Sequence, residues 1–247
     1  MVETIAHSSP LFFPMGEQAI VVQFENEVSL EVSHHVQKFI HLIKESGVPG
    51  ITQLLPAFNN LTVCYDPAIA DYDQLLEYLK SLETSSLEMK DLHSKTVNIP
   101  VVFGGEYGPD LDIIARHADL TEQEVVNKLL SKSYFVYMIG FIAGYPYCGD
   151  IDPMLSLPRR TNPRLKVEKG TIQIVNNLTG IFTMTAPSGW HLMGWTPMNM
   201  FNPYNDPPSL LQAGDHVKYV PISASEAEQW DAKRQRKWDQ EWNSSQY

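Results

Sequence analysis

Three arginines lie within one six-residue stretch of the sequence. Arg159, Arg160 and Arg164 are half of the chain's six arginines, and Pro158 and Pro163 restrict the backbone beside them. A guanidinium group presents a planar fork of N–H donors that matches a carboxylate or a phosphate. Clustered positive charge is costly unless an anion compensates it, so we weigh two interpretations about equally: a site for an anionic ligand, and an internal ion-pair network. The acidic residues nearest in sequence for such a network are Asp150 and Asp152.

The segment before the arginines is rich in residues that shape the backbone or a pocket wall. Gly140, Gly144 and Gly149 permit positive φ angles or close backbone approach. Tyr145 and Tyr147 either line a pocket or pack in the interior, and packing is the commoner outcome. The segment therefore fits a shaped loop beside a binding site, without requiring one.

Other residues whose side chains could take part in catalysis give weaker signals. Cys148 has no histidine near it in the sequence, which favours an inert buried thiol over a nucleophile. His191 follows Trp190 in the dense stretch APSGWHLMGWTP, and a structural histidine is more common there than a catalytic one. The sequence contains no GxSxG, HExxH, P-loop or Rossmann motif. No general catalytic centre is indicated.

The composition limits the possible partners. The 247 residues carry a net charge of -11 with a pI near 5.1, which disfavours binding to nucleic acid. Two cysteines, far apart and without a CxxC pair, predict neither a disulfide framework nor a metal site. The sequence shows no signal peptide and no apolar run of about 20 residues. We expect a soluble cytoplasmic protein that binds no membrane.

Hydrophobic patterning predicts a small α+β domain over residues 1–90. Val36, Phe39, Ile40 and Ile43 follow the spacing of one helical face. The expected elements are a strand at 19–25, a helix at 29–45, strands at 51–58 and 60–66, and a helix from 72 to 82. The polar stretch 83–95 is expected to be a linker.

A mainly β domain is predicted for residues 91–224. A strand at 95–103 precedes a short helix from Leu111, and Thr121 with Glu124 forms a capping-box signature for another helix. Short β-prone runs separated by Gly, Pro and Asn then indicate a barrel or sandwich. Residues 225–247 are expected to form a helical tail, whose tryptophans either cover the end of the barrel or dock a partner.

An ordered series of motifs resembles the KipI family, whose members are also called the B subunit of 5-oxoprolinase or allophanate hydrolase subunit 1. The motifs are IPVVFGGEYGPDLDIIA, YMIGFIAGYPYCGDID, PRRTNPRLKVEKGTIQI, APSGWHLMGWTP and LQAGDHVKYVPI. The resemblance covers about residues 15–222 and implies a cyclophilin-like β-barrel preceded by a small α+β domain.

The resemblance also implies a function with partners. It implies one component of an ATP-dependent complex that opens 5-oxoproline, working with a C-type barrel protein and an A-type protein of the same enzyme. This chain is expected to bind no cofactor, since ATP would belong to a partner. The alternatives are an interaction module that inhibits a histidine kinase, and a carboxyltransferase-type role as in urea amidolyase. A free-standing prolyl isomerase rests on the barrel alone and is disfavoured.

Candidate site residues follow from the arginine cluster and the resemblance together. The expected ligand is a small carboxylate. The substrate-binding candidates are Arg159, Arg160, Arg164, Tyr145, Tyr147, Thr179 and Trp190. Weaker catalytic candidates are Glu106, Asp110 and His191, although Asp110 could simply cap the following helix. The sequence departs from the family pattern at Leu129, Ala143, Cys148, Asp150 and Trp195, and also in the stretch VNNLTGIFT around Asn176–Thr183. If those positions touch substrate, the departures suggest a different ligand or lost catalysis.

Overall fold

The computed structural model describes residues 10–82 and 94–243 and divides into two compact units, Met1–His93 and Ser94–Tyr247. The predicted boundary at residue 90 and most of the predicted linker lie outside the described residues. The helical tail, predicted as a separate region, belongs to the second unit.

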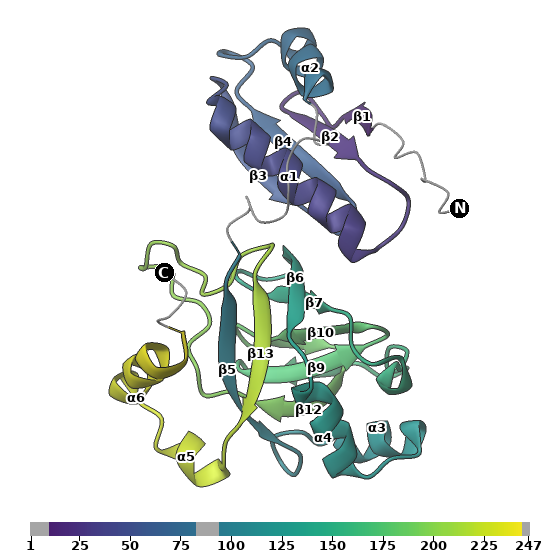
Figure 1. Ribbon diagram of the computed structural model, residues 1–247, viewed down its shortest axis with the longest axis vertical. Helices are drawn as coiled ribbons and strands as arrows, with labels where there is room; N and C mark the ends of the chain where they lie inside the picture. The colour runs from purple at the N-terminus through teal and green to yellow at the C-terminus, as the bar shows by residue number, and fades with distance from the viewer. Residues whose placement is uncertain (1–9, 83–93, 244–247) are drawn as a thin grey trace, which may run out of the picture. The chain divides into compact units, whose positions relative to one another are not determined.

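The first unit is a four-stranded antiparallel sheet with two helices (Figure 1). The strand order is β1-β2-β4-β3. Its elements are β1 (Leu11–Pro14), β2 (Ala19–Gln23), α1 (Leu30–Ser46), β3 (Ile51–Pro56), β4 (Asn60–Tyr65) and α2 (Tyr72–Ser81). Every predicted element is present, and β1 is an additional edge strand. Residues from both helices share one apolar cluster with Ile20, Val22, Leu61 and Val63, so both helices cover the same face of the sheet.

Local signals set the ends of α1. The Ser29 side chain accepts a hydrogen bond from the Val32 amide at the N-terminus. Gly47 adopts the left-handed conformation, with φ of 61°, that ends many helices. The predicted apolar positions Val36, Phe39 and Ile43 are buried. Pattern and capping agree here, which is why the sequence predicts this helix closely.

The second unit contains a closed seven-stranded barrel with strand order β10-β7-β6-β13-β5-β12-β9 (Figure 1). Its strands are β5 (Thr96–Phe103), β6 (Tyr134–Ile139), β7 (Pro146–Gly149), β9 (Thr171–Val175), β10 (Leu178–Ile181), β12 (His191–Trp195) and β13 (His216–Pro221). All pairs are antiparallel except β13 with β5. The predicted mixed fold, an α+β domain followed by a mainly β barrel, is confirmed.

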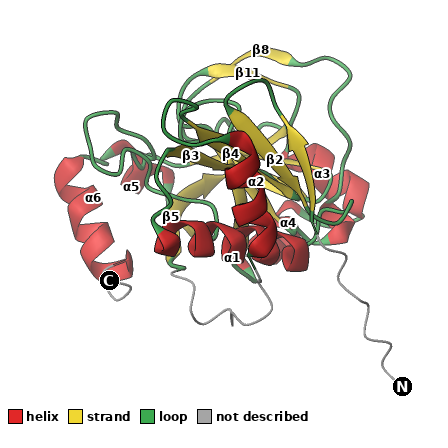
Figure 2. Ribbon diagram, turned by 90° about the horizontal axis from the view of Figure 1, so that it is seen from above, coloured by secondary structure: helices red, strands yellow, loops and turns green. Residues whose placement is uncertain are grey.

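Helices and a short ribbon surround the barrel. The helices α3 (Leu111–Ala118) and α4 (Glu122–Leu130) lie on one side, and the tail helices lie on the other (Figures 1 and 2). The predicted capping box is present, since Thr121 and Glu124 exchange side-chain and backbone hydrogen bonds. A separate two-stranded ribbon pairs β8 (Arg164–Val167) with β11 (Ala186–Ser188) (Figure 2). Between β7 and β8 lies a short 3-10 turn, η2 (Pro153–Leu155).

The tail is not one continuous helix. It forms α5 (Ala224–Glu228), α6 (Ala232–Trp238) and a π-helical turn, η3 (Asp239–Asn243), because Asp231 starts a new helix by accepting from the Arg234 amide. The Trp238 indole donates to the Asn98 carbonyl, and Asn243 Oδ1 accepts from the Asn98 amide at 2.8 Å. The tail thus supplies hydrogen-bond partners for the Asn98 amide and carbonyl of β5. Among the described residues, no neighbouring strand pairs with these backbone groups.

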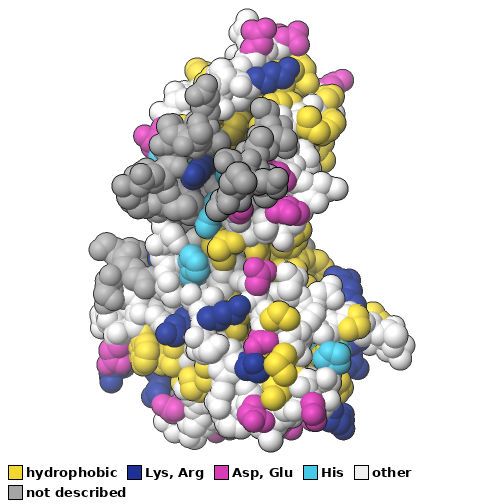
Figure 3. Space-filling view, turned by 45° about the vertical axis from the view of Figure 1, so that its right-hand side comes forward, with side chains coloured by type: hydrophobic (Ala, Val, Ile, Leu, Met, Phe, Trp, Pro, Cys, Tyr) yellow, Lys and Arg dark blue, Asp and Glu magenta, His cyan; other side chains and the backbone are white. Residues whose placement is uncertain are grey.

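The surface carries no single field of positive charge on the face drawn in Figure 3, where acidic and basic side chains are interspersed. Within residues 10–82 and 94–243, no cluster of three metal-ligating side chains is present. No helix among these residues has the length and hydrophobicity needed to cross a bilayer.

Candidate functional site

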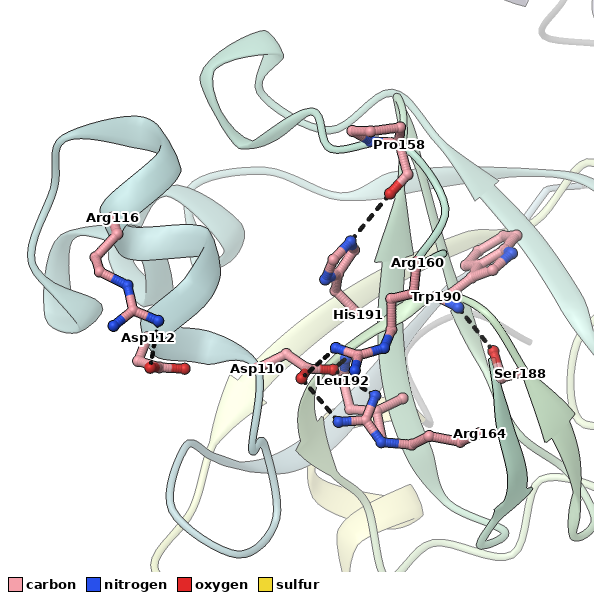
Figure 4. A network of polar contacts seen from close by, with 10 residues as sticks. All are labelled: Asp110, Asp112, Arg116, Pro158, Arg160, Arg164, Ser188, Trp190, His191 and Leu192. Atoms are coloured by element: carbon pink, nitrogen blue, oxygen red, sulfur yellow. Dashed lines mark hydrogen bonds and ion pairs between the residues drawn. The ribbon is translucent and has the colours of Figure 1, made fainter. Parts of the chain in front are cut away.

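Two of the three clustered arginines pair with one buried carboxylate. Arg160 Nη1 lies 3.0 Å from Asp110 Oδ1. Arg164 makes two bonds of 2.8 Å, from Nη1 to Oδ2 and from Nη2 to Oδ1. Figure 4 shows both guanidinium groups directed at this carboxylate, well apart from the Asp112–Arg116 pair on α3. For Arg160 and Arg164, the ion-pair interpretation of the sequence describes the structure.

The partner differs from the one expected from sequence proximity. Asp150 accepts hydrogen bonds from Tyr137 and Asn177, and Asp152 pairs with Lys128 at 2.7 Å. The expectation that these two acids fold back on the arginines is therefore wrong. The real partner, Asp110, is 50 residues before Arg160 and is brought close by the barrel.

Asp110 is fully committed to structural contacts. Besides the three guanidinium bonds, its Oδ2 accepts from the Leu192 amide at 2.8 Å, which fills the four acceptor positions of a carboxylate. Burial raises the pKa of Asp110, but the Arg164 hydrogen bonds, the Leu192 amide and the two positive charges outweigh it, and the pKa is lowered overall. Asp110 occupies the N-cap position of α3, yet its side chain makes no capping bond. A saturated, ionised carboxylate is a poor general base.

The glycine-rich loop at residues 104–108 brings Asp110 against β12. The Gly104 amide donates to the Met193 carbonyl, and the Asp110 amide donates to the Leu192 carbonyl. A Cβ at Gly108 would lie 1.9 Å from the Met193 carbonyl oxygen, so only glycine allows this approach. The loop therefore has a structural role, and Glu106 on it is exposed to solvent.

Arg159 has a different environment. It lines a cavity of about 100 Å³, and no carboxylate of the described residues forms an ion pair with it. The cavity is bounded by Phe141, Tyr145, Tyr147, Arg159, Gln173, Phe182, Pro187, Ser188, Gly189 and Trp190. One cation beside an aromatic wall suits a small anionic molecule with an apolar body.

The cavity and the ion-pair cluster share one ribbon. Ser188 on β11 is the register partner of Arg164 on β8, and the Gly189 carbonyl accepts from the Arg160 amide at 2.8 Å. The paired arginines hold the segment 187–189, which forms part of the cavity wall. Arg160 and Arg164 thus support the cavity without lining it.

Some of the remaining predicted site residues line the cavity, and the others lie outside its wall. Tyr145, Tyr147 and Trp190 line the cavity. Thr179 is buried in the barrel, where its hydroxyl contacts the Gln173 carbonyl and the Tyr219 hydroxyl, and it is absent from the cavity wall. His191 Nε2 donates to the Pro158 carbonyl at 3.0 Å, because a carbonyl oxygen can only accept. Figure 4 shows His191 turned toward Pro158, and the residue is likewise absent from the cavity wall.

None of the five residues that depart from the family pattern is among those that line this cavity. Leu129 and Cys148 are fully buried, and burial raises the pKa of the Cys148 thiol far above its ordinary value, which makes it inert. Trp195 stacks on Tyr107 and donates to the Lys169 carbonyl. Ala143 accepts from Thr183 through its carbonyl.

Sequence reasoning missed several residues of the cavity. Gln173 and Ser188 are polar residues inside β-prone runs, where a side chain facing a pocket looks the same as one facing solvent. Phe141 has a φ of 67°, which is unusual for a residue with a side chain, and is 62% exposed at the cavity. The only available signal for Phe141 was its position between the two glycines Gly140 and Gly144.

The chain is similar to known proteins over most of its length. The family model of the carboxyltransferase domain, subdomain C and D, matches residues 10–211. The B subunit of 5-oxoprolinase from Bacillus subtilis (strain 168) is 33% identical over 219 residues, covering 85% of this chain and 91% of that protein.

Two solved structures are similar in fold. The crystal structure of TTHA0988 superposes with a TM-score of 0.74 at 28% identity and covers 84% of this chain, which spans 40% of that chain. The urea carboxylase of Kluyveromyces lactis has a TM-score of 0.70 at 20% identity, covering 94% of this chain and 25% of that chain. With a family model over most of its length and a relative at this identity, the chain belongs to the carboxyltransferase-domain family, subdomains C and D, that includes the B subunit of 5-oxoprolinase.

Proposed function

We propose that this chain is one component of a complex that hydrolyses a small lactam or amide, with 5-oxoproline as the substrate. The observation that carries the proposal is Arg159, the clustered arginine that lines the cavity and forms no ion pair with a carboxylate of the described residues. A relative named as the B subunit of 5-oxoprolinase, similar over nearly its whole length, supports the choice of substrate.

In this proposal the chain binds and orients the substrate. The Arg159 guanidinium binds the substrate carboxylate as a charge-assisted pair. The aromatic side chains of Tyr147, Phe182 and Trp190 pack against the lactam ring of the substrate. Asp110 has its four acceptor positions filled, and His191 lies outside the cavity wall, so neither supplies a free base to the cavity in this geometry. We therefore assign ATP and the hydrolytic groups to partners of the A and C types.

The test reconstitutes the chain with its A-type and C-type partners and measures ATP hydrolysis that depends on 5-oxoproline. Arg159→Gln is expected to lower kcat/KM about tenfold or more, since a charge-assisted contact is lost. The matched control is Arg116→Gln, which removes a charge from an exposed pair with Asp112 on the same unit. Absence of 5-oxoproline-dependent hydrolysis in a complex that assembles would refute the proposal.

A pull-down from the native host distinguishes the alternatives. Recovery of the A-type and C-type proteins supports the lactam hydrolase, whereas a histidine kinase or a biotin-dependent carboxylase as the main partner contradicts it. A tryptophan tail that docks a partner would favour the kinase-inhibitor alternative. In the structure the tail packs on β5 through Trp238 and Asn243, whereas Trp242 is 44% exposed.

A further inference from the structure

A chain of hydrogen bonds runs along the cavity wall. The Trp190 amide donates to Ser188 Oγ at 3.0 Å, Ser188 Oγ donates to Gln173 Oε1 at 2.6 Å, and Gln173 Nε2 donates to the Tyr145 hydroxyl oxygen at 2.7 Å. All four residues line the cavity, and all four are buried.

The recorded arrangement gives each member of the chain a role. Ser188 Oγ accepts from the Trp190 amide and donates to Gln173 Oε1. The NH₂ group of Gln173 faces the Tyr145 hydroxyl in this arrangement. The Tyr145 oxygen is an acceptor in this network, and its own proton has no acceptor among the described residues.

The Tyr145 hydroxyl is also held in place and kept protonated. Its ring makes edge contacts with Tyr147 and Phe182 at centroid distances of 5.0 and 5.4 Å. Gly180 allows the close approach, since a Cβ there would lie 2.2 Å from the hydroxyl oxygen. The side chain is 1% exposed, and burial raises the pKa of Tyr145 well above its ordinary value. A buried hydroxyl that donates to no acceptor costs free energy. A ligand whose oxygen accepts this hydrogen bond from Tyr145 therefore binds more tightly.

We propose that Tyr145 is a specificity-determining residue, whose hydroxyl donates to a carbonyl oxygen of a ligand that Arg159 holds by its carboxylate. The inference rests on the proposed function in its choice of 5-oxoproline as the first probe. The ligand class is a small ring acid with an oxygen acceptor on the ring. Arg159, Tyr145 and Gln173 line the cavity, and each carries N–H or O–H donors.

Calorimetric titration of the full chain with three ring acids tests this. The first is 5-oxoproline. The second, 3-oxocyclopentanecarboxylate, keeps the carbonyl in the same relation to the carboxylate but lacks the amide. The third, cyclopentanecarboxylate, lacks the carbonyl. Tyr145→Phe is expected to weaken the first two by about tenfold and to leave the third unchanged, because only the hydroxyl is lost. Arg159→Gln is expected to weaken all three.

Two further variants separate recognition from folding. Tyr137→Phe removes a hydroxyl that donates to Asp150 outside the cavity and is the matched control. Gln173→Glu replaces the NH₂ donor by an oxygen that accepts the Tyr145 proton, so it is expected to reproduce the selective loss with the Tyr145 hydroxyl still present. Tryptophan fluorescence verifies that each variant is folded.

The outcomes separate the inference from the proposed function. If the keto acid binds and depends on Tyr145 while 5-oxoproline does not bind, the inference stands and the proposed substrate fails. If 5-oxoproline binds and Tyr145→Phe affects all three acids equally, or none, the inference is overturned and the substrate stands. If none of the three acids binds the folded chain, both are overturned.

Discussion

Arg159 and Arg160 are neighbours in the chain, yet they belong to two regions with different roles. Arg160, together with Arg164, is neutralised by the buried Asp110. Arg159 lines a cavity walled by aromatic rings. The ribbon formed by β8 and β11 contributes residues to both regions. The difference shows that a cluster of like charges in a sequence is not one site, because each side chain takes the partner that the fold provides.

Of the substitutions that test this difference, we expect the largest loss of stability at Asp110. Asp110→Asn leaves two half-buried arginines without their counter-charge, and we expect a loss of about 3 kcal/mol in the free energy of unfolding. Urea unfolding followed by tryptophan fluorescence measures it, since all five tryptophans lie in the second unit. Asp112→Asn, at the exposed pair with Arg116, is the control and should cost under about 0.5 kcal/mol. Equal losses in the two variants would contradict the assignment of Asp110.

The pKa of Asp110 also predicts how the stability difference between the native chain and Asp110→Asn depends on pH. The pKa of Asp110 is lowered in the folded state, so its contribution to stability is fully present above the unfolded pKa of about 3.9. The contribution is lost as the pH falls through the folded pKa. The stability gap between the native chain and Asp110→Asn should therefore be constant from pH 7 to pH 5 and shrink below about pH 4. A gap that stays constant down to pH 2 would show that the charge is not responsible.

Lysine substitutions at Arg164 and Arg159 should change stability by smaller and different amounts, because the two arginines have different environments. Arg164→Lys keeps the positive charge but cannot make two parallel bonds to Asp110, and we expect a loss of about 1.5 kcal/mol in stability. Arg159→Lys should change stability by less than about 0.5 kcal/mol, because Arg159 holds no structural contact of this kind. The same unfolding assay measures both. If Arg159→Lys were the more destabilising of the two, our division of the cluster would be reversed.

Local structure was largely predictable from the sequence. Helix α1 has its apolar spacing, its Ser29 cap and its Gly47 terminator within one segment, and α4 has its capping box at Thr121 and Glu124. The barrel strands follow β-prone runs between Gly and Pro turns. The tail was predicted less well. The sequence predicts one helical tail over residues 225–247, whereas the structure begins a new helix after Asp231, whose side chain caps it.

The candidate site was predictable only in part. Tyr145, Tyr147, Arg159 and Trp190 were proposed from the sequence and line the cavity, whereas Gln173 and Ser188 were not proposed. Their polar side chains face inward because strand register decides which side of a strand is buried. Register depends on the pairing of distant strands, which a single sequence does not display.

By itself, the sequence determined the element types, the likeness to a known family and the presence of three arginines on a proline-restricted loop. Only the tertiary structure decided which arginine faces which partner. Asp110 lies 50 and 54 residues away from the arginines that it binds, and contacts at that separation arise from barrel closure rather than from local preference. An ion pair between distant residues requires that the intervening strands first be placed, and that placement is a property of the whole fold.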